Sequence, residues 1–403
     1  MNFNIPNDVQ FIIDTFYKSG YEAFMVGGCI RDLLLNKNPM DYDIATSAPP
    51  EITERLFSKT IPTGIKHGTI TVIINNTPYE VTTYRTEGKY IGNRRPEEVN
   101  FVTDIKEDLS RRDFTINALA YNDRKGLLDF FNGLSDLNNR FIRCVGEPNL
   151  RFNEDALRML RAIRFSAQLD FDIDIYTYSS IKKNYKLINN ISKERVRDEF
   201  KKILLCNNPI RGLDCLNETN ISSLIFSDFD NIIKVNPNIS LLPKDVCIRI
   251  SGLLANHDPN KVKLFLQTLR FSNDEIHKVF NFISNYRHLN NDLSKLEIKK
   301  VISLVGRENI NLLINLYETI NNISLNNFKE KSNFILFNNE ALYIKDLNIN
   351  GFILKENIKI KSGKLIGEVL THLLSMVMNE TIDNSTTSLL KEAQKYILKN
   401  EVD

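Results

Sequence analysis

The sequence is poor in several residues that often mark a familiar kind of site. Its 403 residues include no tryptophan, five histidines and five cysteines, and the cysteines are scattered without a C-x-x-C pair. A disulfide framework and a zinc ribbon are therefore not expected, and free thiols fit a reducing compartment such as the cytoplasm. No run of about eighteen apolar residues suggests a membrane span. The first residues lack the basic and apolar parts of a secretory signal, so none is expected.

An excess of charge of either sign is missing as well. The chain has 52 basic and 50 acidic residues, for a formal net charge of +2. Binding to nucleic acid would therefore depend on local clusters of charge rather than on a field over the whole chain. With 42% hydrophobic and 25% charged residues, the composition is that of a folded protein, and the length predicts two or more domains.

The first part of the chain mixes helical and strand patterns. Apolar spacing predicts a helix over Asn7–Ser19, and a strand over Tyr21–Val26 that runs into Gly27-Gly28 and a second helix from Cys29 to Leu35. Further strands are expected at residues 41–46, 69–74 and 79–85.

From Glu154 onward, helical periodicity dominates. One helix is expected to begin near Glu154, and another spans Glu194–Leu205 with Ser192 as its N-cap. The rest of the chain reads as largely helical.

Asp41 and Asp43 are the strongest local feature. Residues i and i+2 of a strand face the same side, so these carboxylates would project together and favour a magnesium ion that bridges substrate phosphates. The doublet Gly27-Gly28 stands between a strand and a helix, where missing Cβ atoms let a phosphate approach backbone N–H groups. Arg31, in the first turn of that helix, is a candidate phosphate partner. Each feature alone is common in ordinary turns and solvated edges, but their order favours a nucleotide site.

These features resemble the DNA polymerase β superfamily of nucleotidyltransferases, and more narrowly the class II tRNA nucleotidyltransferases and bacterial poly(A) polymerases. The resemblance covers roughly residues 21–205 and is carried, in order, by GGCIRDLLLNKNPMDYDIATSAPPE, PTGIKHGTITV, YEVTTYRTEGKYIGNRRPEEVNF, EDLSRRDFTINALAYN, RFNEDALRMLRAIRF and ISKERVRDEFKKIL.

The resemblance implies an α+β fold in four parts. These are a nucleotidyltransferase head with a small mixed β-sheet (1–140), an all-α neck that recognises the base (141–205), a helical body (206–290) and a helical tail that binds tRNA (291–403).

Roles for three further residues follow from the resemblance. Glu80, on a strand expected beside the Asp41–Asp43 strand, is a candidate third carboxylate, either as a metal ligand or as acceptor of the primer hydroxyl proton. An ordinary surface glutamate is the alternative. Arg112 corresponds to a nucleotide contact, and Asp113 is a candidate acceptor for a ribose hydroxyl.

Asp155 and Arg158 are three residues apart, which places them on one face of the expected helix. The carboxylate would accept from the amino group of cytosine or adenine while the guanidinium donates to the adjacent ring nitrogen, so uracil and guanine would be rejected. A surface ion pair is the alternative. Arg161 and Arg164 continue the spacing, and the resemblance assigns both to nucleotide binding.

The segment 87–101, with Arg94 and Arg95, resembles the flexible loop of complete CCA-adding enzymes. The G-[RK]-R-F signature of bacterial poly(A) polymerases is absent at Gly64–His67. These points favour CCA addition to tRNA that lacks its 3′ CCA end, from CTP and ATP with Mg²⁺. A poly(A) polymerase, a partial CC- or A-adding enzyme and a non-catalytic RNA-binding relative remain alternatives.

The doublet His257-Asp258 is interpreted as chance rather than as an HD phosphohydrolase site, because no second suitable histidine precedes it in this half. No membrane partner is expected. The oligomeric state is open, with a homodimer as one candidate.

Overall fold

The computed structural model describes residues 3–88, 90–91, 95–96, 99–227, 229, 234–358 and 363–400. The chain divides into two compact units. The first comprises residues 1–235 and 268–270, and the second comprises residues 236–267 and 271–403. Within the described ranges, no helix combines the length and apolar character needed to cross a membrane.

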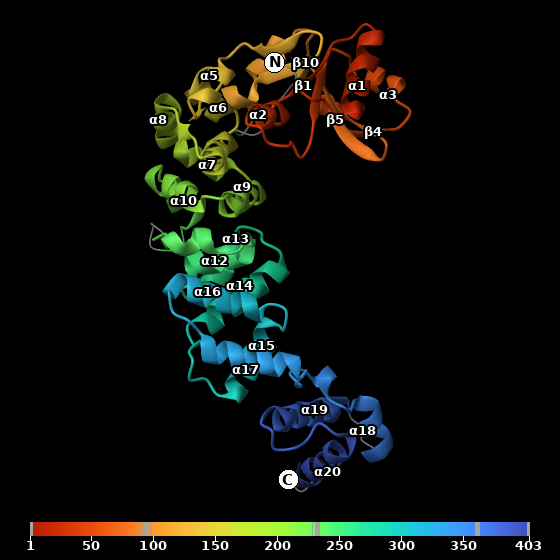
Figure 1. The fold of residues 1–403 in the computed structure, drawn as a ribbon, viewed down its shortest axis with the longest axis vertical. Helices are drawn as coiled ribbons and strands as arrows, with labels where there is room; N and C mark the ends of the chain where they lie inside the picture. The colour runs from red at the N-terminus through yellow and green to blue at the C-terminus, as the bar shows by residue number, and fades with distance from the viewer. Residues whose placement is uncertain are drawn as a thin grey trace. The chain divides into compact units, whose positions relative to one another are not determined.

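The first unit is built on a seven-stranded mixed sheet with the strand order β11-β10-β1-β2-β5-β4-β3 (Figure 1). Its strands are β1 (Ala23–Val26), β2 (Asp43–Thr46), β3 (Thr60–Gly64), β4 (Thr69–Ile74), β5 (Thr77–Thr83), β10 (Leu119–Asn122) and β11 (Gly126–Asp129). Only the β2–β5 pair in this sheet is parallel. The mixed sheet and the helices that follow confirm the predicted α+β class.

Helices cover both faces of this sheet. They include α1 (Asn7–Lys18), α2 (Gly28–Leu34) and α4 (Ile105–Ser110). Ala23 and Met25 of β1 pack with the apolar side of α1, while Phe24 and Val26 pack on the opposite face with α4. This alternation has the two-residue period of a strand and explains why every residue of β1 is buried. The predicted helix over Asn7–Ser19 is confirmed.

The first unit has further helices after β2. They are α3 (Pro50–Leu56), α5 (Gly133–Asn138), α6 (Pro148–Glu154), α7 (Leu157–Leu169), α8 (Ile175–Asn184), α9 (Lys193–Leu205), α10 (Pro209–Glu218) and α11 (Ser222–Ile225). A short parallel pair joins β12 (Phe141–Ile142) to β13 (Asp172–Ile173). Ser192 is the N-cap of α9 as predicted, but its side chain makes no capping hydrogen bond.

The segment predicted as a flexible loop contains short strands. β6 (Arg85–Glu87) pairs with β9 (Val99–Phe101), and β7 (Tyr90–Ile91) pairs with β8 (Arg95–Pro96). Arg94 and the side chain of Arg95 lie outside the described residues.

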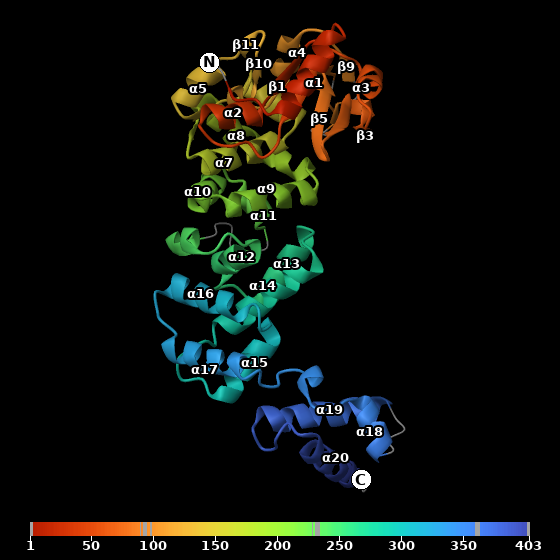
Figure 2. The same cartoon turned by 45° about the vertical axis from the view of Figure 1, so that its right-hand side comes forward.

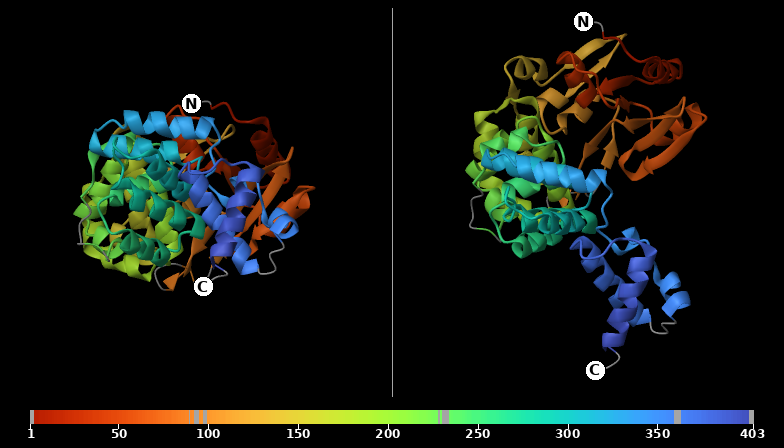
Figure 3. Two further views of the ribbon diagram at one scale, coloured as in Figure 1. Left: turned by 90° about the horizontal axis from the view of Figure 1, so that it is seen from below. Right: turned by 60° about the horizontal axis from the view of Figure 1, so that its bottom comes forward.

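The second unit is helical throughout its regular secondary structure in the described ranges. Its α-helices are α12 (Val246–Leu254), α13 (Pro259–Thr268), α14 (Asn273–Tyr286), α15 (Lys295–Val305), α16 (Ile310–Asn321), α17 (Asn326–Phe337), α18 (Gly351–Ile358), α19 (Gly363–Met378) and α20 (Thr386–Asn400). Helices α12, α14 and α16 lie side by side (Figure 2). Helices α18 to α20, blue in Figure 3, share one apolar core.

The structure gives the His257-Asp258 doublet a local role. Asp258 precedes α13 and its Oδ1 accepts hydrogen bonds from the backbone N–H groups of Asn260 and Lys261 at 2.9 and 3.0 Å. A side chain that satisfies the first N–H groups of a helix is a helix cap.

Candidate active site

Two of the predicted catalytic carboxylates come from neighbouring strands. Asp43 begins β2, and Glu80 on β5 precedes Val81, the partner of Ile44 in the parallel register. Asp43 and Glu80 therefore project from the same face of the sheet. The expectation for Asp41 was wrong in one respect. Because β2 starts at Asp43, Asp41 lies before the strand and does not share a strand face with Asp43.

Asp43 lies in an electrostatically crowded position. Its pKa is raised to about 6. Partial burial is the largest cause, the Arg112 guanidinium lowers the pKa, and the carboxylates of Asp41 and Glu80 raise it. The residue nevertheless reaches solvent. Carboxylates that crowd one another at an accessible edge are suited to a divalent cation. Within the described ranges, no three His, Cys, Asp or Glu side chains form a ready metal cluster.

Gly27 connects β1 to α2 beside this edge. Its φ is 77°, and a Cβ atom there would stand 2.7 Å from Nη1 of Arg112. The backbone conformation favours glycine, and an added Cβ would also displace the Arg112 guanidinium. At Gly28, the first residue of α2, an added Cβ would be 3.6 Å from Nη2 of Arg31, an ordinary contact. Of the two glycines of the doublet, Gly27 is thus the one on which the local packing depends.

Arg31 lies inside the protein rather than on the exposed first turn of a helix. It is 6% exposed. Its Nε and Nη2 donate to Asp32 Oδ1 at 2.9 and 2.8 Å, and its Nη1 donates to Asn117 Oδ1 at 2.8 Å. Arg31 therefore forms part of the wall of the site.

Asp108 accepts hydrogen bonds from the neighbouring arginines Arg111 and Arg112. Its Oδ1 accepts from Nε and Nη2 of Arg111 at 3.0 and 2.8 Å, and its Oδ2 accepts from Nη2 of Arg112 at 3.5 Å. Burial raises the pKa of Asp108, but the two guanidinium charges outweigh that effect and lower it. The buried Nε of Arg112 has no hydrogen-bond partner among the described residues. An unpaired buried donor of a cation beside Gly27 fits an anionic ligand.

Asp113 is already saturated by protein donors. Its Oδ2 accepts from Nε of Arg161 at 2.7 Å and lies 2.6 Å from Nη2, while its Oδ1 accepts from Phe114 N at 2.9 Å and Asn117 Nδ2 at 3.2 Å. Burial raises its pKa, but the Arg161 charge and these hydrogen bonds lower it to about 2. In this structure Asp113 orients Arg161, and a ribose hydroxyl would have to compete with these donors.

The helical premise for Asp155 and Arg158 was wrong. Helix α6 ends at Glu154, Asp155 has an extended backbone with φ −135° and ψ 104°, and α7 begins at Leu157. The two side chains also have different partners. Asp155 pairs with Arg195 at 2.8 Å, and Arg158 pairs with Glu154 at 2.6 Å. Because the helix is interrupted at Asp155, its Oδ1 can accept a hydrogen bond from the Leu157 N–H at 3.0 Å, at the start of α7.

Helix α9 supplies two partners that the sequence interpretation missed. Arg195 binds Asp155, and Glu199 forms a buried ion pair with Arg164, with Oε2 2.7 Å from Nε. Arg195 and Glu199 are four residues apart and therefore lie on one face of α9. That spacing was visible in the segment ISKERVRDEFKKIL and was the signal that could have found them.

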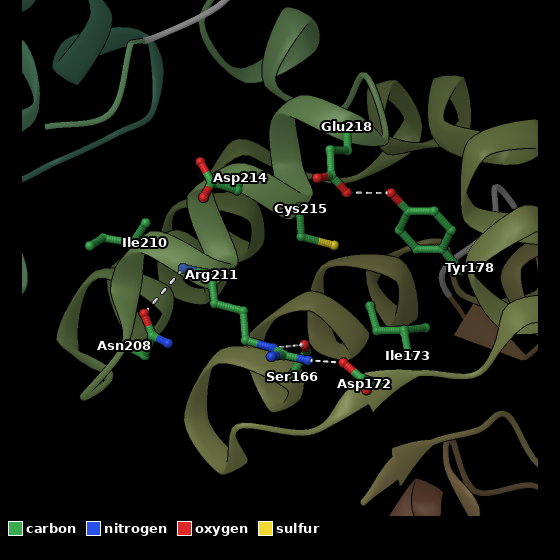
Figure 4. Close-up of a pocket in the computed structure, with 10 residues that line it drawn as sticks. All are labelled: Ser166, Asp172, Ile173, Tyr178, Asn208, Ile210, Arg211, Asp214, Cys215 and Glu218. Carbon is green, nitrogen blue, oxygen red and sulfur yellow. Dashed lines mark hydrogen bonds and ion pairs between the residues drawn. The ribbon is translucent and has the colours of Figure 1, made fainter. Parts of the chain in front are cut away.

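A cavity of about 630 Å³ lies elsewhere in the first unit, among α8, α10 and β13. Figure 4 shows Tyr178 directed at Glu218, and Arg211 directed at Asp172 and Ser166. Its lining contains none of the predicted site residues. Its carboxylates outnumber its single arginine, which makes it a poor receptor for phosphate.

A mixed sheet with carboxylates at the start of one strand, a glycine turn beside them and a set of buried arginines defines a nucleotidyltransferase. Three family models match the chain in order. Residues 23–143 match the poly A polymerase head domain, residues 170–233 the probable RNA and SrmB-binding site of polymerase A, and residues 249–393 a putative tRNA nucleotidyltransferase domain 2.

Comparison with individual proteins indicates which nucleotidyltransferases the chain is similar to in sequence and fold. The chain is 38% identical to the CCA-adding enzyme of Pediococcus pentosaceus over 397 residues, covering 96% of this chain and 97% of the relative. It is 35% identical to that of Ligilactobacillus salivarius, covering 98% of each. The structure of the Bacillus stearothermophilus CCA-adding enzyme in complex with CTP matches with a TM-score of 0.81 and 28% identity, over 97% of each chain. The chain belongs to the CCA-adding enzymes. This family membership indicates a divalent metal requirement.

Proposed function

We propose that this protein adds the 3′-terminal CCA to tRNA from CTP and ATP, and that the first unit performs the chemistry. The observation that carries the proposal is the edge formed by Asp41, Asp43 and Glu80 next to Arg112. Support comes from the match to CCA-adding enzymes over nearly the whole chain.

Asp41 and Asp43 are the residues that would hold Mg²⁺. The crowding of carboxylates around Asp43 fits that role, since it is relieved by a cation. Magnesium, when bound, supplies positive charge that neutralises phosphate oxygens and lowers the pKa of an attacking hydroxyl.

The chain's own residues arrange the transfer. The tRNA 3′ hydroxyl attacks the α-phosphorus, a new O–P bond forms, and the bond to the bridging oxygen breaks to release pyrophosphate. Glu80, which projects from the same face of the sheet as Asp43, would accept the hydroxyl proton. Arg112, Arg161 and Arg164 would stabilise the negative charge of the triphosphate. The unpaired Nε–H of Arg112 can donate a hydrogen bond to a phosphate oxygen.

Base selection requires an exchange of partners. Asp155 would separate from Arg195, and Arg158 from Glu154. The freed Asp155 and Arg158 side chains would then bind the edge of cytosine or adenine, whose donors and acceptors are complementary to theirs. Each good bidentate contact discriminates by about 1–3 kcal/mol against a wrong base.

We assign catalysis to residues 1–140, base recognition to 141–205, and the body and tRNA-binding tail to 206–290 and 291–403. The match of residues 23–143 to a polymerase head domain supports the first of these assignments. We place the reaction in the cytoplasm. A homodimer stays a prediction that sedimentation of the purified chain would test.

An incorporation assay tests the function. With tRNA lacking its 3′ CCA, CTP alone should add two nucleotides, CTP with ATP three, and UTP or GTP none. Repeated addition from ATP alone would instead identify a poly(A) polymerase, which the head-domain match also fits. No incorporation with intact tRNA binding would identify a non-catalytic relative.

The Asp155→Ala variant tests base selection in the same assay. Loss of the acceptor should reduce discrimination against UTP and GTP about tenfold. Glu147→Ala, which removes a carboxylate at the start of α6, serves as the control. Unchanged selectivity in Asp155→Ala would contradict the template role.

A further inference from the structure

Three arginines converge on one aromatic ring in the first unit. The guanidinium carbons of Arg164, Arg31 and Arg161 lie 4.1, 5.1 and 5.4 Å from the centroid of the Phe165 ring. Phe165 is 4% exposed, and its ring meets Phe114 edge-on with centroids 5.7 Å apart. The sequence pattern treats Phe165 as a core residue of α7, yet its ring contacts cations from two helices.

These arginines repel one another. Burial lowers the pKa of Arg164, and the positive charges of Arg161 and Arg31 lower it further, while Glu199 and Asp113 oppose the change. Each arginine forms an ion pair with a different carboxylate. Arg31 pairs with Asp32, Arg161 with Asp113 and Arg164 with Glu199.

The carboxylates alone do not explain why the three groups converge. Asp32, Asp113 and Glu199 come from three different segments, and each holds a different guanidinium. Phe165 is the contact that all three share. The face of a phenyl ring is negative, so it attracts a cation by about 0.5–1 kcal/mol at exposed sites and more when the site is dry.

A ring differs from a carboxylate in one important way. It carries no net charge, so it stabilises neighbouring cations without cancelling their charge. A ring at this point can therefore gather arginines without adding a further negative charge that would repel an anion. An aliphatic residue such as leucine would fill the space and lack the attraction.

We propose that Phe165 is a positioning residue of the nucleotide site, whose ring holds Arg31, Arg161 and Arg164 as one array that receives the triphosphate. The inference rests on the proposed function, because it assumes that nucleoside triphosphates are the ligands. Since the triphosphate is common to CTP and ATP, Phe165 affects both nucleotides alike and does not contribute to base choice.

Fluorinated phenylalanines test the ring's charge with little change in its shape. Each fluorine withdraws electron density from the ring face and weakens its attraction for cations. We would place mono-, di- and trifluorophenylalanine at position 165 of the full chain and measure Kd for CTP and for ATP, with Mg²⁺ and without tRNA. The same series at Phe200 is the control. That residue is buried and meets Phe226 edge-on, and no guanidinium lies over its ring among the described residues.

The expected result is a stepwise rise of both dissociation constants at position 165, to about tenfold for the trifluoro residue. The preference for CTP and ATP over UTP and GTP should not change, and thermal stability should change no more than in the Phe200 series. Unchanged affinity, or weaker binding of only one nucleotide, would overturn the proposal. A wild-type protein that binds neither nucleotide would reject the proposed function itself, which separates that failure from a failure of the Phe165 role.

Discussion

The two units bury charge for different purposes. In the first unit, buried Arg31, Asp108 and Glu199 join residues far apart in the sequence, because their partners include Asn117, Arg85 and Arg164, respectively. In the second unit, buried Arg249 donates to the carbonyl groups of Leu242 and Pro243 just before its own helix. Buried charge in the first unit thus holds residues of the candidate site, whereas Arg249 in the second unit holds the segment before its own helix.

Lys299 is another buried charge of the second unit, and its partners lie far from it in the sequence. It is 2% exposed, lies 2.7 Å from Glu340 and 3.1 Å from Glu380, and donates to the Met378 carbonyl at 3.1 Å. These contacts tie α15 to the ends of α17 and α19. Removing a buried charge from each unit should therefore have different consequences, and the following variants test that difference in order of decreasing effect.

Asp43→Asn should have the largest effect. The change keeps the shape of the side chain and removes its negative charge at the exposed start of β2. We expect nucleotide incorporation to fall about 10³-fold while tRNA binding and thermal unfolding stay close to wild type. The measurement is single-turnover addition of CTP to tRNA. Retained turnover would contradict the metal-binding role of this carboxylate.

Lys299→Met is the corresponding change in the second unit. It removes the buried partner of Glu340, which keeps the more exposed Lys295 at 2.8 Å, and should reduce the stability of that unit by about 3 kcal/mol, measured by hydrogen exchange of α15 amides. CTP affinity should not change. Lys395→Met, at an exposed pair with Glu392, is the control and should cost less than about 0.5 kcal/mol. Weaker CTP binding in Lys299→Met would erase the distinction between the units.

Gly27→Ala and Gly28→Ala form a matched pair. The Cβ of the first would collide with Arg112 in a backbone conformation of φ 77°, while that of the second makes an ordinary contact. Displacing a charged hydrogen-bond donor costs about 1.5–3 kcal/mol, so Gly27→Ala should weaken CTP binding at least tenfold. Gly28→Ala should stay within about twofold. Equal effects in the two variants would show that Arg112 does not depend on Gly27.

Asp113→Asn should reveal a stability effect that depends on pH. The folded protein lowers the pKa of Asp113 from 3.8 to about 2. The ionised group therefore stabilises the fold above pH 4, and this contribution is lost as the pH falls toward 2. Near neutral pH the variant should be about 2 kcal/mol less stable than wild type, and the difference should shrink below pH 4. Asp170→Asn, at an exposed pair with Arg211, should show neither effect.

The sequence predicted the elements best where several chemical groups must occur at fixed spacing. The helix–strand–glycine–helix order before Asp43 and the neighbouring strand that carries Glu80 are both found in the structure. Local patterns could not show the break at Asp155, because the residues on both sides have helical periodicity and only the backbone reveals the extended residue between them.

The partners of the site residues were harder to predict than the residues themselves. Asn117 accepts a hydrogen bond from Arg31, 86 residues earlier in the sequence, and donates one to Asp113. Such long-range contacts leave no periodic signal in the sequence. Phe165 had an apolar residue's pattern in a helix, and nothing in that pattern distinguishes a core ring from one that contacts cations.

The most direct test of this account is a crystal structure of the full chain with CTP and a divalent cation. The account predicts the cation at Asp41 and Asp43, the triphosphate on Arg112 and the arginines around Phe165, and cytosine on Asp155 and Arg158 after release from Arg195 and Glu154. Nucleotide bound instead in the cavity lined by Arg211, or bound with Asp155 and Arg158 still held by those partners, would contradict it.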